Sequence, residues 1–586
     1  MNFGSSTHHT SVSMVAGHTR REPRSRFAGL TIAIATVFML TLLAGTVSAA
    51  PSQPVSGSLQ LFDNLGKHHY AITTGMPLAQ RYFDQGLRLY YAFNHAEAIR
   101  AFAEASRLDP DCAMCRWGQA LAHGPNINAP MEREAALAAY DAIQQAVLRE
   151  AKANPKERAL IRALAVRYAA DPQRTVRYAA DPPKDRSALD AGYARALREV
   201  ANQHPQDYEV ATLYAEALMD LSPWNYWTAD RKPRGKTTEI LKQLERVLAA
   251  KPDHPGANHL YIHAVEAVQP ERAVSAAERL AKLMPGAGHI VHMPGHIYIR
   301  VGRYLDAIKA NEHAVHADEV YIADHRPKSG IYTLGYYPHN YDFLSFAASM
   351  IGRSRQAMEA AEKMRDLAPP DLLRESGMTF LQHHDTRYLQ MQVRFARWQA
   401  ILDASSPADD LLHARAMWQY ARGRALAASG RIKEAEDALH QVRATAENPD
   451  VASLRLEFNQ AGAILRIATE VLAGHVAEAK GDATASITHL REAARLEDAL
   501  TYGEPPEWSV PVRQELGMVL LRADRATEAE QVFRQDLKRF PGNGWSLRGL
   551  ELALRGQGRK DEADRVKEKF RTVWSSADID VPIQPS

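Results

Sequence analysis

Small residues recur along the chain at spacings that predict pairs of antiparallel helices. After Tyr82, a glycine at position 86 is followed by Ala98, Phe102, Ala105 and Pro110. Small side chains at such intervals let two helices cross closely, and a proline ends the second helix. The spacing returns, wholly or in large part, in later stretches: Gly295 with Tyr298, Gly302, Ala307 and Ala314; Gly423 with Gly430, Ala435 and Leu439; and Gly517 with Leu520, Ala529, Phe533 and Pro541.

This pattern resembles the tetratricopeptide repeat (TPR), a helix pair of about 34 residues. The resemblance runs, with gaps, from about residue 78 to about residue 572. It implies an all-α fold, a TPR-type α-solenoid in which roughly nine to eleven antiparallel helix pairs form a right-handed superhelix with a concave groove. Residues 124–128, 258–263 and 292–296 are also similar to segments of uncharacterised bacterial secreted TPR proteins, and this second resemblance implies no activity.

Composition agrees with a helical chain and argues against one class of partner. Hydrophobic residues make up 46% of the 586 residues, and the net charge is only +2. A nucleic-acid-binding protein usually carries a basic stripe with aromatic residues between the charges, whereas Lys and Arg are spread evenly here. We therefore expect a protein or peptide partner and no nucleic acid.

The N-terminus has the order of residues found in secretory signal peptides. Four arginines between positions 20 and 26 precede an apolar run over residues 28–47, which ends in small residues near Ala49 and Ala50. We expect residues 1–50 to be a signal peptide, so that the mature chain is periplasmic or secreted. The alternative is an uncleaved inner-membrane anchor, the only membrane contact expected. We expect a linker over 51–77, a TPR-like solenoid over 78–390 and further TPR repeats over 391–586.

Three histidines and an arginine form one stripe of a predicted helix. His289, His292, His296 and Arg300 follow one another at steps of three, four and four residues, which places them on one face. Pro294 and Gly295 interrupt the same stretch, so a local break in the helix is expected. A helix that serves only for packing needs neither feature.

The repeat pattern predicts which other residues face the groove. In TPR proteins the first helix of each pair lines the concave face, and its inward residues lie at fixed offsets from the small packing residue. Measured from Gly295, those offsets give the stripe above. The same offsets, applied to neighbouring helix pairs, predict further groove residues: His259, His263, His339 and Asp342, and with less support His383, Glu216 and Asp220.

Two functional interpretations follow from this groove. In the first, the chain is an exported scaffold that binds an extended peptide or a partner protein. In the second, it is a metal-binding protein or metalloenzyme with His259, His263, His292 and His296 as ligands, because histidines one turn apart can hold one ion. Glu216, Asp220 and His383 are further candidate ligands, and Zn, Cu or Fe suits such a set. A third possibility is that some of these histidines only pack.

Three other features stand out. Cys112 and Cys115, the only cysteines, precede a predicted helix and are expected to form a disulfide or to be buried thiols; a redox role, or Cu(I) binding together with Met114, remains open. The aromatic segment around Trp224 predicts a loop folded into the groove or over its rim, with simple packing as the alternative. The segment 124–130 ends a helix, and Asn128 is a candidate cap for the next.

Overall fold

The computed structural model describes residues 59–168, 185–375 and 377–581, which are helical and contain no strand apart from isolated bridges. The helices of the first half are α1 (Pro77–Tyr91), α2 (His95–Leu108), α3 (Ala113–Ala122), α4 (Arg133–Leu148), α5 (Pro155–Arg167), α6 (Ser187–Gln203), α7 (Tyr208–Met219), α8 (Thr237–Ala250), α9 (Pro255–Val265), α10 (Val274–Leu283), α11 (Gly288–His292), α12 (Pro294–Arg300) and α13 (Tyr304–His325). The second half comprises α14 (Tyr337–Met350), α15 (Ser354–Asp366), α16 (Thr379–Arg394), α17 (Trp398–Asp403), α18 (Leu412–Ala428), α19 (Ile432–Glu447), α20 (Pro449–Ala452), α21 (Ala461–Ala479), α22 (Ala483–Asp498), α23 (Val512–Arg522), α24 (Ala526–Arg539), α25 (Gly544–Gly556) and α26 (Lys560–Val573).

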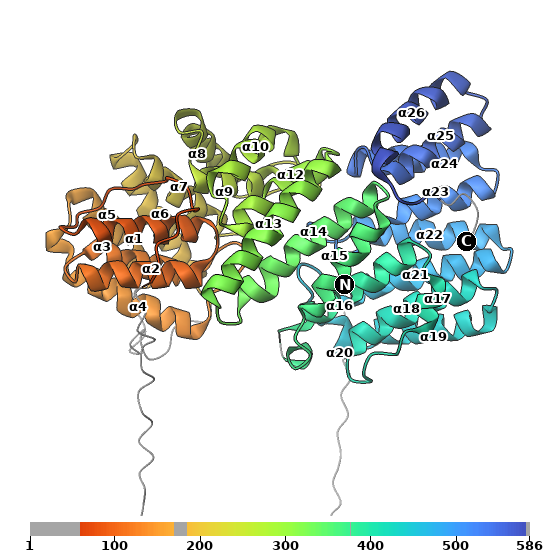
Figure 1. Ribbon diagram of the computed structural model, residues 1–586, viewed down its shortest axis with the longest axis horizontal. Coiled ribbons are helices and arrows are strands. Elements are labelled where there is room, and N and C mark those ends of the chain that lie inside the picture. Colours follow the sequence, from red (N-terminus) through yellow and green to blue (C-terminus); the bar gives the residue numbers. More distant parts are fainter. Residues whose placement is uncertain (1–58, 169–184, 376, 582–586) are drawn as a thin grey trace, which may run out of the picture. The chain divides into compact units, whose positions relative to one another are not determined.

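Successive helices pack as antiparallel pairs, beginning with α1 against α2 and ending with α25 against α26 (Figure 1). Each pair also contacts the next along the chain, as α2 does α3 and α24 does α25. The predicted fold class, an all-α TPR-type solenoid, is confirmed for the described residues. The described residues form twelve pairs where roughly nine to eleven were expected, because short or divergent helices such as α17 complete pairs that the sequence pattern does not reveal.

The small residues of the repeat lie where helices cross most closely. A Cβ added at Gly86 would come within 2.7 Å of the Phe102 ring, and one at Gly517 within 2.4 Å of the Phe533 ring. Both distances are shorter than van der Waals contact, so no larger side chain fits without movement. The spacing of glycine and phenylalanine in the sequence is therefore a packing constraint between the two helices of a pair.

Buried apolar residues form two clusters. The first contains residues between Leu65 and Met391 together with Phe540, and the second contains residues between Val393 and Ala563. Because α16 carries both Met391 and Val393, this helix contributes to both clusters. The candidate site described below belongs to the first.

The predicted signal peptide over 1–50 and the first part of the linker lie outside the described residues. Within the described part of the chain, no helix has the length and apolar character needed to cross a membrane. Residues 59–76 form no helix, yet they are held against the solenoid: the Asn64 carbonyl accepts a hydrogen bond from the Gly286 amide at 2.9 Å, and the Tyr82 hydroxyl donates to the Leu59 carbonyl. This part of the predicted linker is thus packed structure.

The histidine stripe is divided between two short helices. Helix α11 ends at His292 and α12 begins at Pro294, with Met293 between them. Proline has no backbone N–H to donate and its ring displaces the preceding turn, which explains the break. The break in the helix that the Pro294–Gly295 pair predicts is therefore present, and it separates His289 and His292 from His296.

Candidate metal centre

Six imidazoles that the repeat pattern predicts to face inward meet in one place. They come from three consecutive helix pairs: His259 and His263 from α9, His289, His292 and His296 from α11 and α12, and His339 from α14. Neighbouring ring centroids are 4.8 to 5.4 Å apart along the series His259–His263, His259–His289, His289–His292, His292–His296 and His292–His339. All but the half-buried His339 are at most 3% exposed.

Two of these rings have a tautomer that their surroundings fix. The Nδ1 of His259 lies 2.7 Å from the backbone carbonyl of Tyr91, which can only accept, so Nδ1 carries the proton. The Nδ1 of His292 lies 3.2 Å from the Oδ1 of Asn311, whose amide nitrogen donates to the Ala307 carbonyl. In both rings the remaining Nε2 therefore presents a lone pair to the cluster. A metal-binding histidine is typically held in this way.

Glu266 anchors two more imidazoles. It is fully buried just beyond α9, with one oxygen 3.5 Å from the Nδ1 of His263 and the other 3.0 Å from the Nδ1 of His296. Burial acts to raise the pKa of this carboxyl, but His296 and His263 outweigh it and hold the pKa at about 2. Glu266 was not among the residues predicted from the sequence, although its position three residues after His263 places it on the same helical face.

Glu504 reaches the cluster from the loop between α22 and α23. Its carboxylate lies 3.3 Å from the Nδ1 of His296 and 3.4 Å from the Nε of Arg300, and it is 2% exposed. Burial acts to lower the pKa of His296, but Glu266 and Glu504 reverse this and raise it to about 9. In the ion-free chain at neutral pH, His296 is therefore an imidazolium that donates from Nε2 to His292. Arg300 faces this acid, and its other end donates to the Ala267 carbonyl at 3.2 Å.

The remaining nitrogens of the cluster are buried without hydrogen bonds. Neither nitrogen of His289 has a partner among the described residues, and neither do the Nε2 atoms of His259 and His263. Burial, reinforced by neighbouring histidines, holds the pKa values of His259 and His289 well below the usual range, so both rings are neutral. A buried polar group left without a partner costs about 1–3 kcal/mol. His259 and His289 are thus neutral rings with buried nitrogens that are free to bind an ion.

A cavity of about 1050 Å³ opens onto the cluster. The Trp224 ring lies edge-on to His263 with centroids 5.1 Å apart, and the Tyr336 ring lies 4.5 Å from His289. The aromatic segment around Trp224 therefore forms part of the wall, as one of the two interpretations of it predicted. The loop at 125–131 forms another part of the wall. Asn128 does not cap the next helix, because α4 begins after Glu132 and has no side-chain cap.

Four residues predicted to face the groove make other contacts. Asp342 pairs with Arg387 at 2.8 Å, and the Nδ1 of His383 lies 3.4 Å from the Nε2 of His413. Asp220 lines the cavity but pairs with Arg167 at 2.8 Å. Burial and the neighbouring Asp220 raise the pKa of Glu216 to about 8, so this carboxyl is protonated at neutral pH. Glu216, Asp220 and His383 therefore do not join the imidazoles as ligands in this structure. Asp220 is paired with Arg167, His383 lies beside His413, and Glu216 is protonated.

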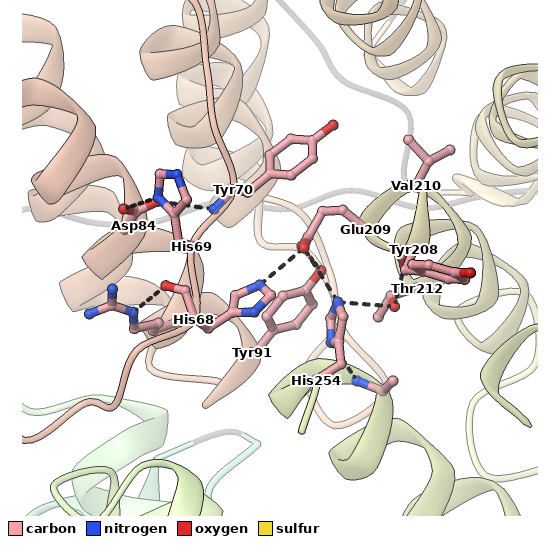
Figure 2. A network of polar contacts seen from close by, with 12 residues as sticks. His68, His69, Tyr70, Asp84, Tyr91, Tyr208, Glu209, Val210, Thr212 and His254 are labelled. Carbon is pink, nitrogen blue, oxygen red and sulfur yellow. Dashed lines mark hydrogen bonds and ion pairs between the residues drawn. The ribbon is translucent and has the colours of Figure 1, made fainter. Parts of the chain in front are cut away.

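A second histidine and carboxylate group lies next to the cluster. Glu209 accepts from the Tyr91 hydroxyl and lies 3.0 Å from the Nε2 of His68 and 3.3 Å from the Nε2 of His254 (Figure 2). The Nδ1 of His254 accepts the Ala257 amide at 3.2 Å, so its Nε2 must carry a proton and cannot offer a lone pair to an ion. This group is therefore a hydrogen-bond network. It holds the side chain of Tyr91, the residue whose backbone carbonyl orients His259.

The cysteines lie apart from these contacts. Cys112 and Cys115 form a disulfide at the start of α3, where the Cys112 sulfur accepts the Cys115 amide. Both side chains are at most 2% exposed. In this oxidised state neither sulfur is a thiolate, so neither can bind Cu(I) in the way that the sequence left open.

Comparisons with known proteins add little to this geometry. No protein-family model matches the chain, and neither does any curated protein sequence. Among solved structures, the human IFIT1 dimer with m7Gppp-AAAA is similar with a TM-score of 0.30 and 12% identity, over 85% of this chain and 91% of that one. The human IFIT1 dimer with PPP-AAAA gives 0.29 and 12%, over 85% and 92%. Naa15/Naa10 bound to HypK-THB gives 0.22 and 13%, over 85% and 73%. Similarities this low say nothing about function.

Proposed function

We propose that this chain is a metal-binding repeat protein that holds a transition metal in its buried histidine cluster. The observation that carries the proposal is the orientation of the rings. Nδ1 of His259 and of His292 lies at an acceptor, which leaves each Nε2 with a lone pair, and Nδ1 of His263 and of His296 lies 3.5 and 3.0 Å from the Glu266 carboxylate. Such outer partners orient metal-binding imidazoles and increase their basicity.

The alternative that these histidines only pack is less consistent with the contacts. A packed core histidine usually has at least one nitrogen paired, whereas both nitrogens of His289 are unpaired, and its ring lies against the Phe93 and Tyr336 rings and other imidazoles. Bringing neutral nitrogen lone pairs together is unfavourable unless a proton or a cation lies between them. Zn, Cu and Fe all accept imidazole, so the donor set supports a transition metal without selecting one.

The cavity supports a second, compatible candidate function. Aromatic side chains of Trp224, Phe380 and Phe458 line it, and the exposed Arg455 stands at its edge. Such walls suit a peptide or small molecule that carries an acidic group. Because five of the six imidazoles are at most 3% exposed, this ligand would contact mainly the walls and His339. In this second candidate function, the chain is an exported scaffold, periplasmic or secreted, whose cavity binds such a ligand.

Metal analysis of the full chain, purified without a His tag, tests the proposal. We expect at least about one equivalent of tightly held transition metal, because three or more imidazoles surround each candidate position. The double variant His259→Ala/His296→Ala is expected to lose it, whereas the control His383→Ala/His413→Ala, which removes the other buried histidine pair, is expected to retain it. Wild-type protein that stays metal-free after exposure to Zn(II), Cu(II) and Fe(II) would refute the proposal.

A further inference from the structure

We infer that the cluster is a two-metal centre in which His259, His263 and His289 bind one ion and His292, His296 and His339 bind the other. The inference rests on the proposed metal binding and adds the number of ions and their arrangement. Within each trio, three nitrogens, one from each ring, lie within 4.8 Å of one another, and the two trios share no residue. Small ring rotations bring such atoms to the spacing that one ion requires.

The number of donors favours two ions. Six imidazoles exceed the four ligands of a tetrahedral ion. An ion bound only by the second trio would leave the Nε2 atoms of His259 and His263, and both nitrogens of His289, buried without partners. A second ion takes one nitrogen from each of these three rings and so gives three of the four atoms a partner.

Glu266 links the two trios. One of its oxygens faces His263 of the first trio and the other faces His296 of the second, so a single carboxylate orients a ligand of each ion. Glu504 adds another buried carboxylate beside His296. Both acids lie beside His296, and Glu504 also lies beside Arg300, so a positive ion bound by His296 is stabilised by two buried negative charges.

The cavity contacts both trios. His263 and His289 of the first, and His296 and His339 of the second, all line it. Across the trios, the rings of His263 and His296 are 5.3 Å apart and those of His289 and His292 are 5.4 Å apart, so both ions share one chamber. Three protein ligands leave an open position on each ion. The centre therefore suits hydroxide or another small anion that bridges both ions, with azide as the probe.

Metal stoichiometry of the untagged full chain tests the inference. After loading with Cu(II) or Zn(II) and desalting, we expect about two equivalents in the wild type, since each trio supplies three ligands. His289→Ala and His339→Ala are each expected to retain about one, because each damages a different trio, while His383→Ala retains the wild-type amount. Circular dichroism confirms that each variant is folded.

Two further outcomes separate the inference from the proposal on which it rests. With copper, the wild type is expected to show an electron paramagnetic resonance signal much smaller than its copper content, because two close Cu(II) ions couple; the single-site variants regain a full signal, and azide changes the wild-type spectrum most. A wild type that saturates at one equivalent, lost in both variants, would overturn the two-ion inference and leave metal binding intact. A wild type that binds none would overturn both.

Discussion

The Nε2 atoms of His292 and His296 lie 3.1 Å apart in the interior of the protein. Two ligands on a tetrahedral ion with bonds of about 2.0–2.1 Å are separated by roughly 3.3 Å, so the rings already have nearly the spacing of a bound pair. In the ion-free chain, a proton on His296 bridges the same gap. In the proposed metal-bound state, the ion takes the place of this proton with little movement of the rings.

Asn311 is expected to matter for metal binding although it touches no ion. Its side chain fixes the Nδ1 proton of His292, which leaves Nε2 free as a ligand. We predict that Asn311→Ala weakens metal binding by about 10–100-fold, the usual effect of removing such a partner. Competition with a chromophoric chelator measures it. Asn459→Ala, which removes another buried amide, is the control, and equal affinity in both variants would contradict this role.

Glu266 is expected to support both trios. Replacing it with glutamine keeps the shape but removes the negative charge that faces His263 and His296. We predict that Glu266→Gln weakens the binding of both equivalents, by about 10-fold or more each. Calorimetric titration separates the two steps. A loss confined to one step would show that Glu266 serves only one trio, and Glu497→Gln controls for the loss of a buried acid elsewhere.

Glu209 is expected to act as a positioning residue for the first trio. It holds the Tyr91 side chain (Figure 2), and the Tyr91 carbonyl fixes the His259 ring. We predict that Glu209→Gln lowers affinity for one equivalent by less than about 10-fold, because the effect passes through a second residue, and leaves the other unchanged. Tyr70→Phe, which removes a neighbouring hydroxyl contact to Asp207, is the matched control. Unchanged affinity for both equivalents would contradict the prediction.

Stability is expected to depend on pH through Glu497, a buried acid outside the histidine cluster. Burial raises the pKa of Glu497 to about 7, although Arg539 opposes this. The folded chain then holds a proton that the unfolded chain releases above its ordinary pKa, so stability falls as pH rises from about 4.5 to 7, by at most about 1.4 kcal/mol per pH unit, and levels off above it.

The substitution Glu497→Gln is expected to remove this slope, so that the variant gains stability relative to the wild type at pH 8 and not at pH 4. Urea unfolding at several pH values measures the effect. The exposed Glu568→Gln serves as the control. If the variant keeps the wild-type dependence of stability on pH, that dependence arises from other groups and the prediction is wrong.

Local spacing predicted the helix pairs and the inward histidines, because both follow from helix periodicity and from a repeat of fixed length. The partners of those histidines were harder to predict. Glu266 lies one turn from His263 and was within reach of the same reasoning, whereas Glu504 is brought in by a loop more than two hundred residues from His296. Asp342 shows the converse: its position follows the repeat, but Arg387 on α16 takes its carboxylate.

Anomalous diffraction from crystals of the metal-loaded protein tests the central claim most directly. The account predicts two anomalous peaks in the histidine cluster, one within bonding distance of His259, His263 and His289 and one within bonding distance of His292, His296 and His339. Peaks only at surface residues, or no peak in the cluster of a protein that has taken up metal, would contradict it.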